Sequence, residues 1–572
     1  MFRKVEKTLP EDPEYPTDLK ELGYFINATG QIRKIAHPDE DFQFHLTNDE
    51  RHNELHREAM QIFQRREIQA RLAKLGIVPL YIPQLSTTKP IRQPHIPILA
   101  PPASMLKTRQ RIILVVNDSM QDLGILAYRQ LQRELGLNGG SVINFTKEIV
   151  KRSSPLLECW SRDDTFDLGE FTNVPQGAPG LIVTNTGQRF YSHRHNQAVS
   201  MRSWSAMPRK SLCHEAHRMH QIENTVEGNR EPQEHVKYVL DHVITNRDFV
   251  SADAEVYVIG IEDGGQYLLE ILDADWDKYG HIITAMALIQ TGCSPAQFSS
   301  PLLKSFLHRR AREWRVSAQD QPNVCIEVPK TAHIQEGTAV LTASTDEFAP
   351  RLSPINWLQA ISSSSAGLPT SISPEKLCIV DELESGKTTP GRHEDDEPLC
   401  PTFSAGETTI PECIFTDPAI YTSILGFFEE VAQDPAKYSN PKFAVNASPA
   451  SDNAESELPQ EVDPQQIEIE DRKAQILHMK ESLAHIPEGD EILKKGKEDL
   501  EKRIMRMEEQ VKEMMKVQLA KGGLKSGEGA EVRNEWKAVG GGPKVKFAGI
   551  MVDSDLLKGA GLFDSAEGEA KG

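Results

Sequence analysis

The residues that come nearest to a catalytic motif lie at 260–265, in the sequence GIEDGG. An apolar run at 256–259 precedes them and a predicted helix follows, so they form a sharp strand-to-helix turn. A nucleophile elbow needs glycine two positions before and two positions after its central residue, because side chains there would collide with the strand or the helix. Gly260 and Gly264 hold these positions around Glu262. A carboxylate cannot supply the alkoxide of ester hydrolysis, so the motif is a degenerate elbow or an ordinary turn with glycines.

A second group of functional candidates is a set of arginines, namely Arg309, Arg310, Arg312 and Arg315, on a helix expected at about 301–315. Such a group can form a phosphate-binding patch for RNA. The alternative is a solvated helix face whose arginine stems cover the core. The chain has 64 Lys and Arg against 84 Asp and Glu, a net charge of -20, which repels phosphate backbones and disfavours a dedicated duplex binder.

Histidines gather between residues 193 and 220, but they do not form a zinc signature. The run 213–220 would need histidine four positions after His214, where Arg218 stands instead. We therefore expect no metal and no cofactor.

The elements that must position the elbow follow from the hydrophobic pattern. Apolar runs near 112–116, 180–183, 256–259, 282–288 and 324–328 alternate with stretches of helical spacing. Strands that are apolar on both faces and separated by helices predict a mostly parallel sheet covered on both sides, which is the α/β class.

The length of 572 residues allows several domains, and only 38% of the residues are hydrophobic. We expect a disordered N-terminus at 1–20, an α/β domain at 21–440 with a disordered insertion at 362–398, and an acidic linker at 441–466. Heptad-like spacing then predicts a helical hairpin or coiled coil at 467–521, followed by a flexible tail at 522–572 with a short docking motif. Self-association through 467–520 is one expected role of these helices.

The sequence also limits the compartment. Seven cysteines without a C-x-x-C pair indicate reduced thiols. No apolar run reaches the roughly 20 residues that span a bilayer, and the first residues lack the apolar core of a signal peptide. We expect a protein of nucleus and cytoplasm without a membrane partner.

Several short segments occur in a specific order along the chain: 23–27 (GYFIN), 30–35 (GQIRKI), 260–265, 403–407 (FSAGE) and Glu412. In this order they resemble the Argonaute-binding (Arb-type) domain of fungal small-RNA silencing proteins, which also occurs at the C-termini of class II histone deacetylases. The resemblance covers about 20–440 without the insertion. It implies an α/β-hydrolase-like fold used for binding, with Argonaute or chromatin-silencing proteins as partners and small RNA contacted indirectly.

Two departures from a hydrolase accompany the replacement of serine by Glu262. The segment 116–118 lacks the usual His-Gly of an oxyanion-hole loop, and no histidine follows Ser404 to Glu407, where a base is expected. We therefore expect a pseudo-hydrolase and not an enzyme. The alternative is a hydrolase-fold enzyme with Glu262 as a carboxylate nucleophile and His333 as its base.

The resemblance also suggests where binding occurs. Asn117 and Asp118 follow the strand that a hydrolase-like sheet places beside the strand ending at Glu262 and Asp263. These side chains are expected to form an acidic cleft that repels RNA and suits a basic peptide, while Arg309, Arg310, Arg312 and Arg315 would supply any RNA contact. Alternatively, Glu262 caps the following helix.

Overall fold

The structure is a computed structural model that describes residues 8–153, 175, 177–318, 320–329, 397–407, 412–445, 464–522, 544–547 and 550–553. The chain divides into two compact units. The first contains residues 1–461 and 475–505, and the second contains residues 462–474 and 506–572. All of the expected site residues lie in the first unit.

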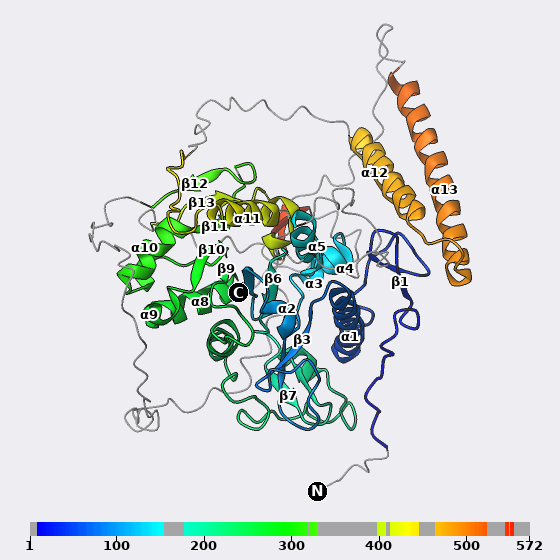
Figure 1. Ribbon diagram of the computed structural model, residues 1–572. Coiled ribbons are helices and arrows are strands. Elements are labelled where there is room, and N and C mark those ends of the chain that lie inside the picture. Colours follow the sequence, from blue (N-terminus) through cyan, green and yellow to red (C-terminus); the bar gives the residue numbers. More distant parts are fainter. Residues whose placement is uncertain are drawn as a thin grey trace, which may run out of the picture. The chain divides into compact units, whose positions relative to one another are not determined.

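A nine-stranded sheet forms the centre of the first unit (Figure 1). Strand β4 is antiparallel to both of its neighbours and β12 is antiparallel to β13, while the other pairs are parallel. The expected mostly parallel α/β sheet is therefore confirmed. From one edge to the other the strands are β12 (Cys325–Glu327), β13 (Thr402–Ser404), β11 (Ala311–Arg315), β10 (Ile283–Ile289), β9 (Glu255–Ile261), β5 (Arg111–Val116), β6 (Gly180–Val183), β4 (Ile96–Ala100) and β3 (Val78–Ile82).

The order of the strands decides which loops meet. Strand β6 follows β5 in the sequence but lies on its far side, so β5 is hydrogen-bonded to β9, with Val116 opposite Gly260. This arrangement is hydrolase-like, and it brings the loop after β5 beside the turn after β9 at the carboxyl edge of the sheet.

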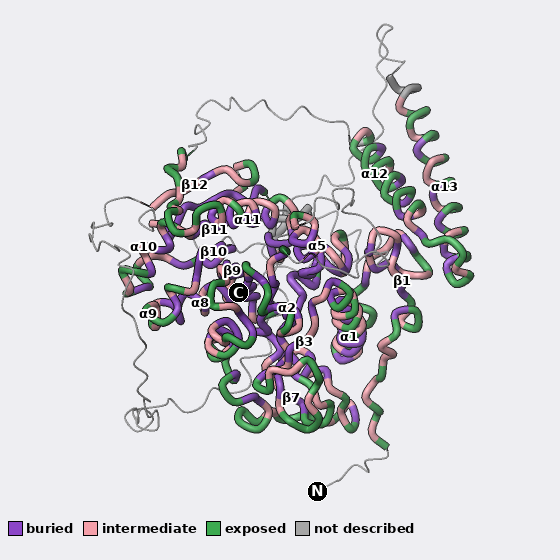
Figure 2. Tube along the Cα trace, viewed as in Figure 1, coloured by how far each residue is buried: buried purple, intermediate pink, exposed green. Residues whose placement is uncertain are grey.

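Helices cover both faces of the sheet, and alternate residues of each strand point to opposite cores. On β5, Ile113 and Val115 belong to one core with α1 (Glu50–Lys74), α5 (Ile143–Arg152) and α11 (Pro418–Val431). Residues Ile112 and Leu114 belong to the other core with α7 (Pro232–Val239), α8 (Asp263–Ala274) and α10 (Pro301–Arg310). Figure 2 shows the central strands as buried (purple) between these layers. Burial on both faces explains why the central strands β5, β6, β9 and β10 are almost entirely apolar.

Short elements complete the first unit. They are β1 (Tyr24–Ile26), β2 (Ile32–Lys34), α2 (Ala103–Leu106), α3 (Tyr128–Leu131), α4 (Gly136–Gly139), β7 (Phe190–Ser192), β8 (Gln197–Val199), α6 (Met201–Ser205), a π-helical turn (Leu240–Ile244), α9 (Trp276–Tyr279) and two 3-10 turns (Pro295–Gln297 and Ile414–Thr416). Strands β1 and β2 are antiparallel and form a small N-terminal hairpin.

The predicted helices at 467–521 are present as α12 (Pro464–Ala484) and α13 (Glu491–Gly522), separated by a turn at 485–490. The part of them that belongs to the first unit, residues 475–505, packs against the N-terminal hairpin. The Ala28 amide donates to the His485 carbonyl (2.9 Å), and Lys20 pairs with Asp490 (2.7 Å). We call residues 475–505 the helical tip. The sequence did not predict that it docks.

The second unit contains the other ends of the two helices. Arg472 donates to Gln510 (3.0 Å) and Gln518 donates to Gln466 (2.9 Å), so these ends lie antiparallel as in a hairpin. The same unit holds strands β14 (Lys544–Phe547) and β15 (Ile550–Asp553), which are antiparallel and fall within the segment interpreted as a docking motif.

Two expectations need correction. The helix expected at 301–315 ends at Arg310, and β11 begins at Ala311, because residues 311–314 pair in parallel with β10. Residues 8–20 were expected to be disordered, but Asp12 forms two hydrogen bonds with Arg51 (2.8 and 3.0 Å), and both side chains are buried. Residues 362–396 of the expected insertion at 362–398 and most of the linker at 441–466 lie outside the described residues.

Candidate functional site

The turn after β9 has the backbone geometry of a nucleophile elbow. Glu262 has φ 48° and ψ -124°, a conformation that costs a non-glycine residue about 1 to 3 kcal/mol. A Cβ added to Gly260 would lie 2.7 Å from the Gly265 Cα, and one added to Gly264 would lie 2.3 Å from the Asn117 carbonyl oxygen. Because both contacts involve backbone atoms, the glycines are needed for the turn to close. Glu262 therefore occupies the position of a nucleophile in an intact elbow.

The loop after β5 packs directly against this turn, as expected from the sequence. Thr186 donates through its hydroxyl to the carbonyl oxygens of Asn117 (2.8 Å) and Asp118 (3.1 Å). The buried Asn117 side chain donates to the Ile125 carbonyl (2.7 Å), and Ser119 donates to the Asp263 carboxylate (3.4 Å). Asn117, Asp118 and Asp263 are thus held beside Glu262.

Glu412 is a fourth carboxylate at this place, and the sequence did not assign it to the site. It accepts hydrogen bonds from the backbone amides of Arg129 (2.7 Å) and Gln130 (3.3 Å) and from the Gln121 side chain (3.4 Å). It lies just before the 3-10 turn that leads into α11. We call Asp118, Glu262, Asp263 and Glu412 the acidic cluster. The only advance signal for Glu412 was its place in the matching motifs.

The acidic cluster shifts the protonation of its own members. Burial raises the pKa of Glu262 to about 7, and the charges of Asp118, Asp263 and Glu412 contribute to this rise. Burial also raises the pKa of Asp118 to about 6, with Asp263 adding to the shift, although the amides of Met120 and Ser119 oppose it. The raised pKa places the titration of Glu262 close to neutral pH.

A buried ionic network supports the loop that carries Asp118. Arg65 on α1 donates to Asp122 (2.6 Å) and to Glu58 (2.6 Å), and the Tyr128 hydroxyl also donates to Asp122 (2.6 Å). Burial by itself raises the pKa of Asp122, but the Arg65 guanidinium outweighs this and holds the pKa below its usual value. The network holds this loop in place, and no pattern in the sequence indicated it.

Glu262 stands at the N-cap position of α8, but its side chain makes no capping hydrogen bond. The alternative that it serves as a helix cap therefore has no support in the geometry. The buried Cys413 lies beside the cluster, and burial together with the Glu262 charge raises the pKa of its thiol.

The four arginines expected to bind RNA do not share one face. Arg312 is buried beneath Phe427 (4.3 Å to the ring centroid) and pairs with Glu430 (2.8 Å). Arg315 pairs with the fully buried Glu313 (2.6 Å). The remaining two, Arg309 and Arg310, lie at the end of α10, where Arg310 donates to the Ala436 carbonyl (3.2 Å). Their separation follows from the change of helix to strand at residue 311.

A hydrolase also needs a histidine base, and a metal site needs a group of ligands. Residues 394–477 of the sequence contain no histidine, and His333 lies outside the described residues. Within the described ranges, no group of three or more His, Cys, Asp or Glu residues could hold a metal ion. No helix among the described residues is long and apolar enough to span a bilayer.

Comparison with known proteins gave one result. The family model for the Arb2 domain matches residues 15–321, which is more than half of the chain. No curated protein and no solved structure matches. The matched segment includes the N-terminal hairpin, the loop after β5 and the elbow, whereas Glu412 and the helical tip lie beyond it.

Proposed function

The chain belongs to the Arb2 domain family, and on that premise we propose that it is a non-enzymatic binding subunit that holds Argonaute or a chromatin-silencing protein. In this proposal it works in nucleus and cytoplasm in RNA-mediated heterochromatin silencing. Small RNA is contacted through the protein partner and not by this chain directly.

The observation that carries the proposal is the carboxyl group of Glu262 at the elbow. Its backbone keeps the strained geometry that presents a nucleophile, but the side chain is a carboxyl group whose pKa burial raises to about 7. Strained conformations persist where the surrounding structure enforces them and commonly mark functional sites. A retained elbow without a serine therefore supports a role in recognition.

The chemistry of the acidic cluster indicates what the partner presents there. The carboxylates of Asp118, Asp263 and Glu412 accept hydrogen bonds and carry negative charge, so RNA phosphates are repelled. A lysine or arginine side chain on a protein loop supplies both donors and positive charge. We therefore propose that a basic segment of the partner protein meets the acidic cluster.

The rival function, an enzyme with Glu262 as a carboxylate nucleophile, is less well supported. An attacking carboxylate must be ionised, whereas burial and the neighbouring acids raise the pKa of Glu262 to about 7. An ester intermediate also needs a base to activate water, and the sequence around the 3-10 turn at 414–416 offers no histidine.

A direct binding experiment tests the proposal. The full chain and purified Argonaute are mixed, and retention is compared for the wild type, for Glu262→Ala with Asp118→Ala, and for Asp248→Ala with Asp253→Ala. The last two positions are exposed acids outside the cluster. We expect the cluster variant to lose most of the Argonaute while the control retains it. A folded cluster variant that keeps every protein partner would show that the cluster is not the recognition site.

A further inference from the structure

A polar cavity lies away from the elbow, between the Arb2 domain and the helical tip. Its volume is about 780 Å³, within the range of ligand-binding pockets. The wall from the domain comes from the β1–β2 hairpin, α1, the α4 region and the start of α11. The opposite wall comes from the helical tip. His478, Glu481 and Ser482 lie on one face of α12, because Glu481 and Ser482 follow His478 by three and four residues, and His485 begins the turn after the helix.

Most of the charge in this cavity is already neutralised. Arg33 pairs with Asp41 and donates to Gln31 (2.8 Å), while Arg71 pairs with Glu67 (2.8 Å) and donates to Asn138 (2.9 Å). The two guanidinium groups therefore act as structural parts of the walls. A bound molecule must be recognised by the groups that remain.

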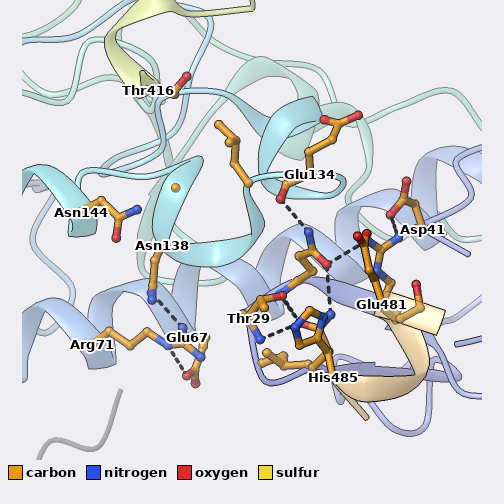
Figure 3. A pocket seen from close by; sticks show the side chains of 18 of the residues that line it. Thr29, Asp41, Glu67, Arg71, Glu134, Asn138, Asn144, Thr416, Glu481 and His485 are labelled. Carbon is orange, nitrogen blue, oxygen red and sulfur yellow. Dashed lines mark hydrogen bonds and ion pairs between the residues drawn. The ribbon is translucent and has the colours of Figure 1, made fainter. Parts of the chain in front are cut away.

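Six of the lining side chains have no hydrogen bond or ion pair with another described residue. They are the ammonium of Lys74, the amide of Asn144, the carboxylates of Glu134 and Glu481, the hydroxyl of Ser482 and the imidazole of His485. Lys74 follows Arg71 by three residues on α1 and so lies on the same helix face. Figure 3 shows Arg71 and Asn144 on one side of the cavity and Glu481 on the other. The cavity consequently has a positive end at Lys74, where the Asn144 amide also lies, and a negative end at Glu481.

This bipolar arrangement selects among possible ligands. RNA carries negative charge along its whole backbone and would be repelled at the Glu481 end. A polypeptide segment can present an acidic side chain to Lys74 and a basic side chain to Glu481, while its backbone bonds with the Asn144 amide. Gln130 connects the cavity with the acidic cluster. Its side-chain oxygen accepts a hydrogen bond from the hydroxyl of the cavity residue Thr416 (3.0 Å), and its backbone amide donates to the Glu412 carboxylate (3.3 Å).

We propose that this cavity binds an extended, charge-balanced segment of the protein partner, with an acidic residue at Lys74 and a basic residue at Glu481. The inference rests on the proposed function, since the partner is the one that also meets the acidic cluster. It assigns the helical tip a role as one wall of the binding site.

The test measures the affinity of the full chain for Argonaute free of RNA. The variants are Lys74→Glu and Glu481→Lys, with Lys107→Glu and Glu227→Lys as matched reversals at exposed positions outside the cavity. Lys74 and Glu481 are themselves exposed, so folding should be retained, and thermal melting checks this. We expect each cavity variant to bind at least about tenfold more weakly and each control to bind like the wild type.

Overlapping peptides that cover the Argonaute sequence then locate the segment. The peptide that binds the wild type is then synthesised with its acidic and basic residues exchanged. This exchanged peptide should bind the double variant Lys74→Glu with Glu481→Lys more tightly than it binds the wild type. A merely structural role of the two residues would not produce such rescue.

The remaining outcomes are distinct. If Argonaute binds the cavity variants as tightly as the controls, the cavity inference is wrong and the proposed function stands. If the wild type does not bind Argonaute at all, both are wrong. If a small-RNA duplex alone binds the wild type, more weakly after Lys74→Glu and more tightly after Glu481→Lys, the occupant is RNA and the polypeptide inference is overturned.

Discussion

Gly264 lies so close to Asn117 that a Cβ on the glycine would come within 2.3 Å of the asparagine carbonyl oxygen and 2.6 Å of the Val116 carbonyl oxygen. Backbone atoms cannot relieve a clash by changing rotamer as side chains do. Gly264→Ala should therefore separate the elbow from the loop after β5. We expect the free energy of unfolding in urea to fall by about 2 to 3 kcal/mol.

The matched control for this substitution is Gly426→Ala on α11, where an added Cβ meets nothing within 4 Å. Alanine should stabilise that helix by about 0.5 to 1 kcal/mol. Equal effects of the two substitutions would show that the elbow and the loop are not packed as described.

The pKa of Glu262 predicts a pH-dependent stability. Its value rises from 4.5 to about 7 on folding, so between these limits the folded state binds more protons than the unfolded state. The wild type should therefore lose stability relative to Glu262→Gln as pH rises from about 4.5 to about 7, by about 2 to 3 kcal/mol in total. Urea unfolding of both proteins at pH 5 and pH 8 measures this difference. Glu227→Gln, at an exposed position, should show none.

The network around Arg65 should be costly to break. Arg65→Met leaves the carboxylates of Asp122 and Glu58 buried without their cation, and we expect the unfolding free energy to fall by about 3 to 5 kcal/mol. Arg218→Met removes an arginine whose ion pair with Glu215 is almost fully exposed, and it should change the unfolding free energy by at most about 0.5 kcal/mol. A loss at Arg65 no larger than at Arg218 would contradict the described network.

The proposal that the chain is not an enzyme can be tested against the hydrolase alternative. We expect no turnover of p-nitrophenyl esters, haloalkanes or epoxides by the wild type, and none of the esters by Glu262→Ser. The serine would regain a hydroxyl but would still lack a histidine to accept its proton. The assay compares purified protein with buffer. Turnover by the wild type that disappears in Glu262→Gln would establish the carboxylate nucleophile instead.

The docked helical tip can be tested at Gly496, where an added Cβ would lie 2.2 Å from the Ile35 carbonyl oxygen. Alanine favours the helix itself by about 1 kcal/mol, so Gly496→Ala should strengthen α13 but weaken its docking. Hydrogen exchange at the Ala28 amide, which donates to His485, should become at least about tenfold faster. The Asn27 amide, which bonds within the N-terminal hairpin, should keep its exchange rate.

The elbow could be predicted from the sequence because its signal is local. The spacing of Gly260 and Gly264 around Glu262 defines the turn, and the hydrolase-like strand order then brings Asn117 and Asp118 beside it. Both parts of this prediction are confirmed as geometry. The role of these residues in binding stays a prediction.

Other features could not be predicted because they depend on long-range pairing. Arg312 and Trp314 have spacing that suits a helix or a strand, and pairing with β10 decides for the strand. The partners Arg65 and Asp122 are far apart in the sequence, and no local pattern connects them. The helical tip docks partly through polar contacts such as Arg503 with Asp39 (3.0 Å), which hydrophobic spacing does not reveal.

The position of β13 has a consequence for experiments on shortened proteins. The family match ends at residue 321, but β13 at Thr402–Ser404 pairs with β11 and covers that strand. A fragment of residues 15–321 would leave β11 as an open edge with unpaired amides and carbonyls, next to the buried Trp314. Such an edge recruits strands from other molecules. Aggregation of that fragment would therefore result from the truncation at residue 321 and not from an inability of the domain to fold.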